Sequence, residues 1–286
     1  MELHLFYKYL AALRPWSFPA SLTPVALGSC LAYKSTSSFS FGIFLVTCLI
    51  VLSIHAAGNL VNSYYDFIRG VDTDAQSDDR TLVDKMFKPH DVSKLILSCY
   101  VIGSLGFILI LYISSTNKLL MSVIYFGGLC GSYLYTGGFG LKYIAMGDIA
   151  IFILFGPITV FFTYLTQGGT ASWLPVCYSV PLALNTCAIL HSNNYRDMRY
   201  DSNAGISTLA IILGETYSYI LYITLLFMPI ILFMVMGIYM SYWFFLPCGI
   251  VVFMFKFETD FRNGKLSCMP QNLAKINFQM GILYII

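Results

Sequence analysis

Charged side chains are scarce in this sequence. Asp, Glu, Lys and Arg make up 10% of its 286 residues, whereas 58% are hydrophobic. So small a charged share excludes an ordinary soluble domain, in which roughly 25% of residues are charged. Because spanning strands would alternate polar and apolar positions, the long apolar segments favour membrane helices over a barrel. We expect no separate soluble domain.

The sequence also lacks the cysteine spacings of zinc sites and disulfide-stabilised domains. Its eight cysteines form no CxxC pair and lie mostly inside apolar segments. They are interpreted as small residues that are compatible with lipid. A cleaved signal peptide is disfavoured, because the first apolar segment carries Pro15, Pro19 and Pro24 and no clear cleavage site.

Long apolar segments predict the architecture. They run over residues 16–33, 41–67, 92–113, 119–135, 143–166, 173–190, 217–239, 242–255 and 276–286. Most are near the length that crosses about 30 Å of hydrocarbon, but the ninth is too short and predicts an incomplete helix. We therefore predict one all-α transmembrane domain over residues 1–286, a bundle of about nine helices.

Charge is distributed unequally if these segments alternate across the membrane. One side receives the N-terminus and the loops at 67–91, 136–142, 191–216 and 256–275. The N-terminus and these four loops, together with the residues that flank them, hold every acidic residue and every Lys and Arg except Lys34 and Lys118. The positive-inside rule places this side in the cytoplasm. We expect the loops 67–91 and 191–216 to cap a site there.

Two similar N-x-Y-x-D motifs occur where two predicted helices reach this side. Residues four apart share one face of a helix, so each motif predicts a stripe of oxygen ligands. The motifs occur four spans apart, on the second and sixth predicted helices, which predicts two pseudo-repeated four-helix halves around a central cavity. The amide and acidic members, with one further Asp after each motif, are Asn62, Asp66, Asp72, Asn193, Asp197 and Asp201.

Several carboxylates beside hydrocarbon require cations to neutralise them. Mg²⁺ prefers oxygen ligands and often shares them with substrate phosphates, so it suits these motifs. The stretch from Asp72 to Asp79 lacks the Gly and Glu of a calcium loop, and a Ca²⁺ site is disfavoured. Among nearby cations, Arg80 and Lys142 are the best candidates to bind a diphosphate.

Further polar and aromatic residues extend the predicted site. His55 and Asn59 continue the first stripe inward, where interhelical hydrogen bonding is a more common role for His than catalysis. Tyr135 lies at the depth where tyrosine commonly anchors the interface. An aromatic cavity would also stabilise an allyl cation through its ring faces, so Tyr135 is kept as a candidate substrate contact.

These motifs together resemble the UbiA superfamily of intramembrane aromatic prenyltransferases. The N-x3-D-x3-G-x-D pattern from Asn62 to Asp72 is similar to the menaquinone branch, and the spacing of Asp197 and Asp201 fits the family. The segment that begins at Arg14 and the Y-T-G-G segment at Tyr135 are also similar to that branch.

The resemblance implies roles for the candidate residues. Two Mg²⁺ ions would bridge the diphosphate, and Arg80 and Lys142 would contact its oxygens. Arg14 and Asn193 would lie near the acceptor quinol or the diphosphate. The implied ligands are Asn62, Asp66 and Asp72 for one ion, and Asp197 and Asp201 for the other.

Runs at 58–62, 77–84 and 189–194 resemble an animal branch of the family that makes menaquinone-4 in endoplasmic reticulum and Golgi membranes. This implies transfer of a geranylgeranyl group from its diphosphate to menadiol. The implied partners are the prenyl diphosphate, the quinol and the bilayer, with no nucleic acid. Another aromatic acceptor such as dihydroxynaphthoate stays open, as does a lipid-sensor role. A transporter is disfavoured, because its site would lie near the midplane of the membrane.

Overall fold

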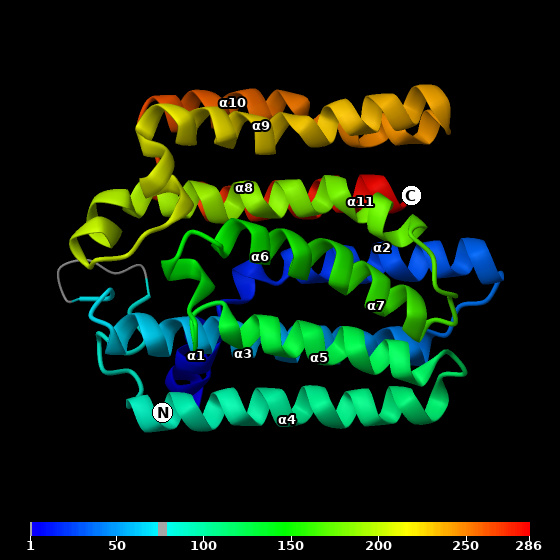
Figure 1. The fold of residues 1–286 in the computed structure, drawn as a ribbon, viewed down its shortest axis with the longest axis horizontal. Helices are drawn as coiled ribbons and strands as arrows, with labels where there is room; N and C mark the ends of the chain where they lie inside the picture. Colours follow the sequence, from blue (N-terminus) through cyan, green and yellow to red (C-terminus); the bar gives the residue numbers. More distant parts are fainter. Residues whose placement is uncertain (1, 74–78) are drawn as a thin grey trace.

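Helices make up most of the chain in the computed structural model, which describes residues 2–73 and 79–286 (Figure 1). Among these residues no strand occurs, and one isolated bridge pairs Ile144 with Ser207. The all-α prediction is confirmed. The helical elements are α1 (Glu2–Leu13), η1 (Pro15–Ser17), α2 (Pro19–Thr36), α3 (Phe41–Ile68), α4 (Pro89–Ile113), α5 (Lys118–Leu134), η2 (Leu141–Tyr143), α6 (Gly147–Ile153), η3 (Leu154–Ile158), α7 (Thr159–Thr166), α8 (Leu174–Asn203), α9 (Leu209–Tyr239), η4 (Tyr242–Ile250), α10 (Val251–Arg262) and α11 (Met269–Ile285).

The helices differ in number from the predicted nine. The π-helical turn η3 joins α6 and α7 into one rod, and the described residues then form ten helices. The unpredicted one, α1, is too short to cross a membrane, so a search for long apolar segments misses it. The last helix begins at Met269, before its apolar segment, because polar side chains such as Gln271 do not interrupt a backbone hydrogen-bond ladder.

The predicted cap loop 191–216 is wrong for most of its length. α8 continues to Asn203 and α9 begins at Leu209, so only residues 204–208 lie between them. The second motif is therefore carried on a helix that extends beyond its apolar segment. The other predicted cap, 67–91, corresponds to the connection 69–88, of which residues 74–78, including Asp74 and Asp78, lie outside the described part.

The outer surface is apolar, as lipid requires. Within the described residues, five helices are long and apolar enough to cross a membrane, namely α3, α4, the α6–α7 rod, α8 and α9, and α5 is a shorter apolar helix. Large side chains such as Leu105, Ile108 and Leu119 are exposed on these helices. Because soluble proteins rarely expose such continuous apolar surface, this pattern is that of an integral membrane protein.

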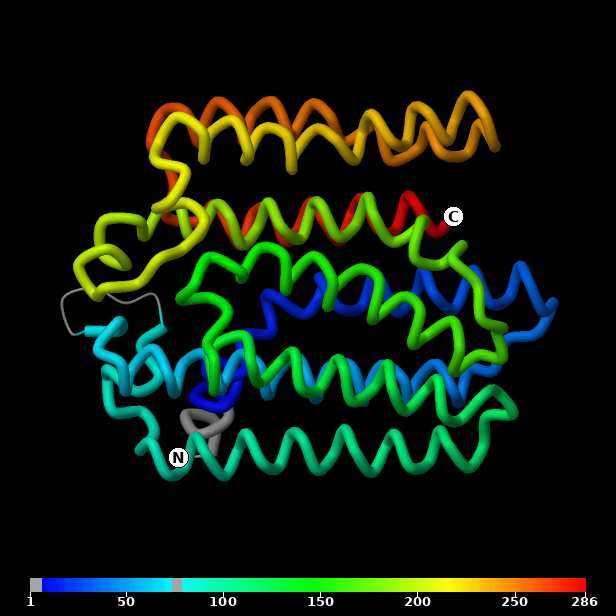
Figure 2. The backbone as a smooth tube through the Cα atoms, viewed as in Figure 1, coloured from blue at the N-terminus to red at the C-terminus, as the bar shows by residue number. Residues whose placement is uncertain are grey.

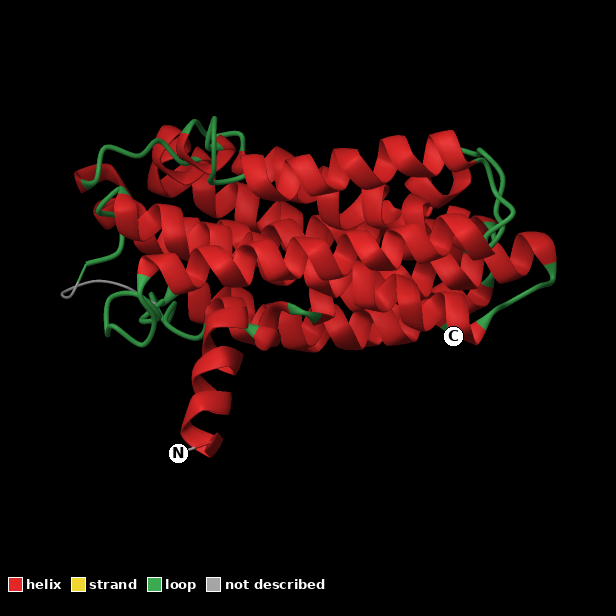
Figure 3. Cartoon of the chain, turned by 90° about the horizontal axis from the view of Figure 1, so that it is seen from below, coloured by secondary structure: helices red, strands yellow, loops and turns green. Residues whose placement is uncertain are grey.

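The helices stack in layers along one direction (Figures 1 and 2). α9 and α10 form one outer layer, α8 and α11 lie beneath it, and α4 forms the opposite side next to α3. The rod α6–α7 and α2 lie between these layers. α1 projects away from the bundle, as the view from below shows (Figure 3).

Close approach and buried hydrogen bonds hold the helices together. A Cβ on Gly28 of α2 would lie 2.5 Å from the backbone oxygen of Val160 in α7, so only glycine allows this contact. Asn277 of α11 accepts a hydrogen bond from Thr23 at 3.3 Å and donates one to Thr186 at 3.1 Å. Since lipid supplies no hydrophobic force between helices, such contacts stabilise the bundle.

Both acidic motifs lie at the same end of the bundle. The described parts of four connections, 69–73 with 79–88, 135–146, 204–208 and 263–268, gather there, on the left in Figure 1, and we call this the acidic end. The prediction that the two motifs reach one side of the bundle is confirmed by this arrangement.

Candidate active site

One cavity of about 780 Å³ opens at the acidic end and continues into the bundle. Its walls come from η1, α2, α3, α5, the α6–α7 rod, α8 and α11. The residues proposed from the sequence all line it, and they are Arg14, Asn62, Asp66, Asp72, Arg80, Tyr135, Lys142, Asn193, Asp197 and Asp201.

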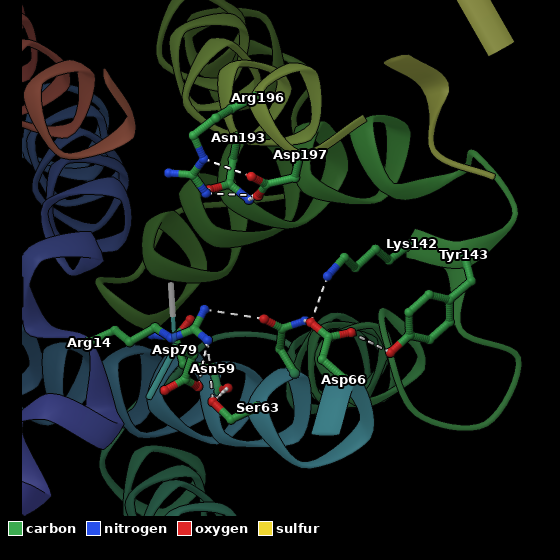
Figure 4. Close-up of polar contacts among 11 residues, drawn as sticks. Arg14, Asn59, Ser63, Asp66, Asp79, Lys142, Tyr143, Asn193, Arg196 and Asp197 are labelled. Atoms are coloured by element: carbon green, nitrogen blue, oxygen red, sulfur yellow. Dashed lines mark hydrogen bonds and ion pairs between the residues drawn. The ribbon is translucent and has the colours of Figure 1, made fainter. Parts of the chain in front are cut away.

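Asp66, in the last turn of α3, accepts hydrogen bonds from three side chains (Figure 4). Its Oδ2 accepts hydrogen bonds from Asn62 Nδ2 at 2.7 Å and from Lys142 Nζ at 2.6 Å. Its Oδ1 accepts one from the Tyr143 hydroxyl at 2.7 Å. The predicted pairing of Asn62 and Asp66 on one helix face is confirmed, and Tyr143 is an additional partner.

A tight turn brings Lys142 and Tyr143 to Asp66. Gly140 has φ +62°, and a Cβ there would lie 2.4 Å from a ring carbon of Tyr143, so both conformation and space require glycine. The Lys142 N–H donates to the Tyr135 carbonyl at 2.8 Å, which fixes the turn on the end of α5. Sequence reasoning found Tyr135 and Lys142 but missed Tyr143.

Electrostatics keep both donors protonated. Burial would lower the pKa of Lys142, but the charges of Asp66, Asp201 and Asp72 and the hydrogen bond to Asp66 together outweigh it, and the pKa is raised. For Tyr143, burial and the Asp66 charge both raise the pKa of the hydroxyl. The Arg69 guanidinium lies 4.2 Å from the centre of the Tyr143 ring. Asp66 therefore faces a stable cation and a stable hydroxyl donor.

Arg14 connects the N-terminal segment to the first motif. Its backbone adopts φ 52°, which is uncommon for a residue other than glycine. The guanidinium donates to Asn62 Oδ1 at 3.2 Å and to Asp79 Oδ2 at 2.7 Å. Although burial opposes it, the Arg14 charge and hydrogen bonds from Ser63, Thr81 and Arg14 lower the pKa of Asp79 to about 2.

A hydrogen-bond network holds the bend that carries Arg14. The Ser17 hydroxyl donates to the Arg14 carbonyl at 2.8 Å and accepts from Asn59 Nδ2 at 3.1 Å. With its hydrogen committed, Ser17 accepts from His55 Nε2 at 3.2 Å, which leaves His55 Nδ1 to accept from Ser21 at 2.7 Å. The predicted interhelical hydrogen bonding of His55 is confirmed.

The second motif, on α8, has its own cation. Arg196 Nε donates to Asp197 Oδ1 at 2.8 Å, and a second nitrogen donates to Oδ2 at 2.7 Å, which is a fork-like contact. The Asn193 amide nitrogen also donates to Asp197 Oδ2, at 3.3 Å. The pairing predicted for Asn193 and Asp197 is confirmed, and the close partnership of Arg196 was missed although it directly precedes Asp197.

Asp201 differs from the other carboxylates of the site. It is buried and lines the cavity, but no described residue donates a side-chain hydrogen bond to it or forms an ion pair with it. The charge of Lys142 lies close enough to act on it, and so do the like charges on Asp197, Asp66 and Asp72. A buried carboxylate among other carboxylates is an environment that favours a bound cation.

Arg80 and Asp72 lie at the mouth of the cavity. Arg80 Nε donates to Asp84 Oδ1 at 3.0 Å, and its side chain is partly exposed. The Asp72 N–H donates to the Asp66 carbonyl at 3.2 Å, so the backbone after α3 turns back over the motif. Both residues are thus placed at the opening, while Asp66 and Lys142 lie further inside.

The site fits Mg²⁺ only as a partner of a phosphate group. Among residues 2–73 and 79–286, no three His, Cys, Asp or Glu side chains form a complete cluster for an ion. Mg²⁺ commonly takes one or two carboxylates and completes its octahedron with phosphate oxygens and water. The oxygen-only donor set, with Asp201 lacking a protein donor, suits that arrangement.

Another buried acid, Asp148, escaped sequence reasoning because it lies within an apolar segment. Asp148 Oδ1 lies 3.1 Å from His191 Nδ1, and His191 Nε2 donates to the Ser218 carbonyl at 3.1 Å. The pair joins α6, α8 and α9 beside the cavity without lining it. Its geometry indicates a structural role in positioning α8.

The fold and the cavity define a membrane-embedded enzyme whose carboxylates and cations face an enclosed, partly apolar space. The chain matches the UbiA prenyltransferase family over residues 21–265, and it belongs to that family of prenyltransferases. Curated relatives named UbiA prenyltransferase domain-containing protein 1 support the assignment. The Mus musculus protein is 48% identical over 99% of this chain and 84% of its own length. The Danio rerio protein is 51% identical over 97% of this chain and 82% of its own.

Solved structures agree on the fold. A UbiA homolog from Archaeoglobus fulgidus, bound to GPP and Mg²⁺, superposes with a TM-score of 0.68 at 15% identity. It covers 97% of this chain, and this chain covers 99% of it. The apo UbiA homolog from Aeropyrum pernix K1 has a TM-score of 0.70 at 15% identity, with coverages of 93% and 96%.

Proposed function

We propose that this prenyltransferase moves a geranylgeranyl group from its diphosphate to menadiol, with Mg²⁺, and so makes menaquinone-4 in its reduced, quinol form. The observation that carries the proposal is the cavity itself. Two acidic motifs, from α3 and α8, share it with Arg14, Lys142 and Arg196 at the acidic end, and its inner part is apolar. A diphosphate with a long prenyl tail has this distribution of charge.

Each side chain has a role in the proposed reaction. Lys142 and Arg80 donate hydrogen bonds to diphosphate oxygens, while Arg14 and Asn193 orient the diphosphate or the acceptor. Tyr135 presents its ring to the reacting carbon. Bound Mg²⁺ supplies charge stabilisation of the leaving diphosphate. The proposed ligands are Asn62, Asp66 and Asp72 for one ion, and Asp197 and Asp201 for the other.

The chemistry balances without a further reactant. The bond between the allylic carbon and the diphosphate oxygen breaks, and its electron pair leaves with the diphosphate. The electron-rich quinol ring attacks the allylic cation, a carbon–carbon bond forms, and the ring releases a proton. The product is therefore the quinol of menaquinone-4, and an oxidant such as dissolved oxygen converts it to the quinone after release. The cationic donors matter most as charge accumulates on the leaving oxygens, because interactions that strengthen in the transition state accelerate the reaction.

Relatives support the diphosphate and the metal. The Archaeoglobus fulgidus homolog holds DMAPP and Mg²⁺ in one structure and GPP and Mg²⁺ in another. The proposal also places the acidic end in the cytoplasm, by the distribution of Lys and Arg, and the protein in endoplasmic reticulum or Golgi membranes. We also propose that α3 and α8 occupy equivalent positions in two four-helix halves, since α8 is the fourth span after α3.

Another acceptor, such as dihydroxynaphthoate, would use the same diphosphate site. A transporter or a lipid sensor without catalysis has less support. The cavity is closed at the end opposite the acidic residues, where Thr47 and Thr166 are fully buried and share a hydrogen bond at 3.1 Å. A transport pathway would require polar groups that continue toward that end.

Purified protein in detergent tests the proposal directly. Geranylgeranyl diphosphate is offered with menadiol, with dihydroxynaphthoate or with hydroxybenzoate, in Mg²⁺ or in excess EDTA, and products are separated by chromatography. We expect menaquinone-4 from menadiol, only with Mg²⁺, and a higher kcat/KM than for the other acceptors. Preference for another ring would correct the acceptor, and transfer to none by folded protein would contradict the proposal.

A further inference from the structure

We propose that the aromatic pair Tyr125 and Phe162 closes the inner end of the cavity and sets the longest prenyl chain that this protein accepts. The inference rests on the proposed function, because it takes the prenyl tail to enter the cavity behind the diphosphate. It adds a specificity determinant for the donor substrate, far from the residues that bind the diphosphate.

The inner half of the cavity is a tunnel with apolar walls. We call it the prenyl tunnel, and its apolar wall residues are Ile50, Val51, Ile54, Ile124, Gly128 and Ile158. His55 of α3 lies beside these wall residues and carries a polar ring. Both of its ring nitrogens are hydrogen-bonded to serines. No unpaired charge therefore faces a hydrocarbon chain there.

The length of the tunnel follows from α3. Residues that line the cavity on this helix run from Asp66 at the acidic end to Ile50. Sixteen residues of α-helix correspond to about 24 Å, at about 1.5 Å per residue. A chain of several isoprene units can extend over such a distance, whereas a short prenyl group would leave the inner part empty.

Three helices agree on where the tunnel ends. On α3 the lining residue furthest from the acidic end is Ile50, and on α7 it is Phe162. On α5 the furthest lining residue is Ile124, and its neighbour Tyr125 also lines the cavity. The rings of Tyr125 and Phe162 have centroids 6.1 Å apart and side chains 3% and 4% exposed. They therefore form a floor across the tunnel.

The floor is fixed in place by its neighbours. Tyr125 stacks on Phe107 of α4, with ring centroids 3.9 Å apart and planes 5° apart. The Tyr125 hydroxyl shares a hydrogen bond with Ser104 at 3.0 Å. Phe162 also contacts Phe107, at 6.2 Å between centroids. Moving either ring would break these contacts, so a longer chain cannot push the floor aside without a cost.

Beyond the floor, buried side chains of α3 and α7 pack against each other. Leu165 and Thr166 of α7 and Thr47 of α3 are fully buried, and the two threonines are hydrogen-bonded to each other. Gln167 then bonds both backbone groups of Ser40, at 3.1 Å each. A chain that reaches Phe162 has no continuation, and each further isoprene unit must fold back or leave the tunnel.

The alternative is that the tail leaves the cavity sideways between helices and lies in lipid. Chain length would then have little influence, because the end of the tail would touch no protein. The two arrangements differ in one measurable quantity, the ratio of kcat/KM for a chain one isoprene unit longer to kcat/KM for geranylgeranyl.

The experiment offers full-length protein farnesyl, geranylgeranyl and geranylfarnesyl diphosphate in competition, with one acceptor and Mg²⁺, and measures the product ratios. We expect wild type to disfavour the geranylfarnesyl chain by about tenfold or more, the discrimination that tight apolar contacts achieve. Phe162→Ala should raise the geranylfarnesyl to geranylgeranyl ratio by about tenfold. Phe162→Leu should raise it less.

A second variant narrows the tunnel. A Cβ on Gly128 would lie 3.3 Å from Ile158, so Gly128→Leu should fill the tunnel and shift preference toward farnesyl. Gly127→Leu is the matched control, because a Cβ there meets nothing within 4 Å and the residue does not line the cavity. Its product ratios should equal those of wild type.

The outcomes separate the inference from the function beneath it. Transfer with unchanged chain-length ratios in Phe162→Leu and Gly128→Leu, both folded by thermal melting, would overturn the inference and leave the proposed function intact. Absence of prenyl transfer by folded wild type, with every donor and acceptor, would overturn both. Opposite shifts in the two variants, with none in Gly127→Leu, would support the tunnel.

Discussion

Asp66 shows at the scale of one residue how this site is prepared for a highly charged substrate. The carboxylate receives donors from three directions, and two of them, Lys142 and Tyr143, come from a single tight turn. Because the turn is fixed to Tyr135 and to Gly140, the donors keep their positions before a substrate arrives. Such preorganisation reduces the cost of reorganising the site during the reaction.

Lys142 is the first test at this scale. Lys142→Met keeps the length of the side chain but removes the cation that we expect to move from Asp66 to the diphosphate. We expect kcat/KM to fall by about 100-fold, in the range for loss of one charge-stabilising donor. Lys118→Met, at the opposite end of the bundle, is the matched control and should leave kinetics unchanged. Equal effects of the two substitutions would contradict the assigned role.

Tyr143 tests the environment of the proposed metal ligand. Tyr143→Phe removes one hydrogen bond to Asp66 Oδ1 and leaves the ring under Arg69 in place. Loss of such a supporting hydrogen bond typically weakens metal binding by about tenfold or more. The Mg²⁺ concentration for half-maximal activity should rise accordingly, and Tyr112→Phe, at an exposed ring, should not change it. An unchanged Mg²⁺ requirement would argue against Asp66 as a ligand.

Much of the site could be predicted at this scale, for a physical reason. Asn62 with Asp66 and Asn193 with Asp197 are four residues apart on helices, so their shared faces follow from helix geometry alone. Tyr143 could not be predicted as a partner of Asp66, since the contact depends on a turn between two helices. Asp148 and His191 were missed because a buried pair needs knowledge of which helices touch.

At the scale of elements, the sequence locates helices better than their ends. Apolar segments indicate where lipid lies, but hydrogen bonds of the backbone continue where polar side chains begin. α8 therefore carries its motif well beyond residue 190, to Asn203. The rod α6–α7 contains a π-helical turn at Pro157, whose missing N–H interrupts the regular ladder. The pattern of apolar residues in the sequence does not predict that π-helical turn.

The connection 69–88 is anchored by the ion pair of Asp79 with Arg14. Asp79→Asn keeps the shape and removes the charge, and we expect a loss of about 1–3 kcal/mol in the free energy of unfolding near pH 7. Chemical denaturation in detergent measures it. The loss should be constant above a pH of about 5, because Asp79 is ionised in both folded and unfolded protein there.

The pH dependence of that loss has a definite sign. The folded pKa of Asp79, about 2, lies below its usual value, so the ion pair stabilises the protein above the unfolded pKa. The stabilisation is lost as the pH falls through about 4 toward 2. Wild type and Asp79→Asn should therefore converge in stability at acid pH. A difference that grew on acidification would contradict this account.

Helix contact makes a separate prediction at the same scale. Gly28→Ala places a Cβ against the Val160 backbone oxygen, which cannot move away as a side chain could. We expect the free energy of unfolding to fall by about 1–3 kcal/mol, as overpacking of a buried contact does. Thermal melting in detergent measures the change, with Gly127→Ala as the control. No difference between the two variants would mean that α2 and α7 are further apart.

The whole molecule brings together two motifs that are far apart in the sequence. α8 is the fourth span after α3, but the carboxylates of the two helices line one cavity with cations from the N-terminal segment, the 135–146 connection and α8 itself. The sequence predicted this convergence from the repeated motif. It could not predict the closed inner end, which arises only when side chains of α3, α5 and α7 meet.

The most direct test of the central claim asks whether the two motifs act as one site. Binding of geranylgeranyl diphosphate with Mg²⁺ is measured by calorimetry for wild type, Asp66→Asn, Asp197→Asn and the double variant. We predict one molecule bound per chain, a loss of affinity of about tenfold or more in each single variant, and a double variant little worse than either. Two molecules bound per chain, or losses that simply add, would contradict a single shared site.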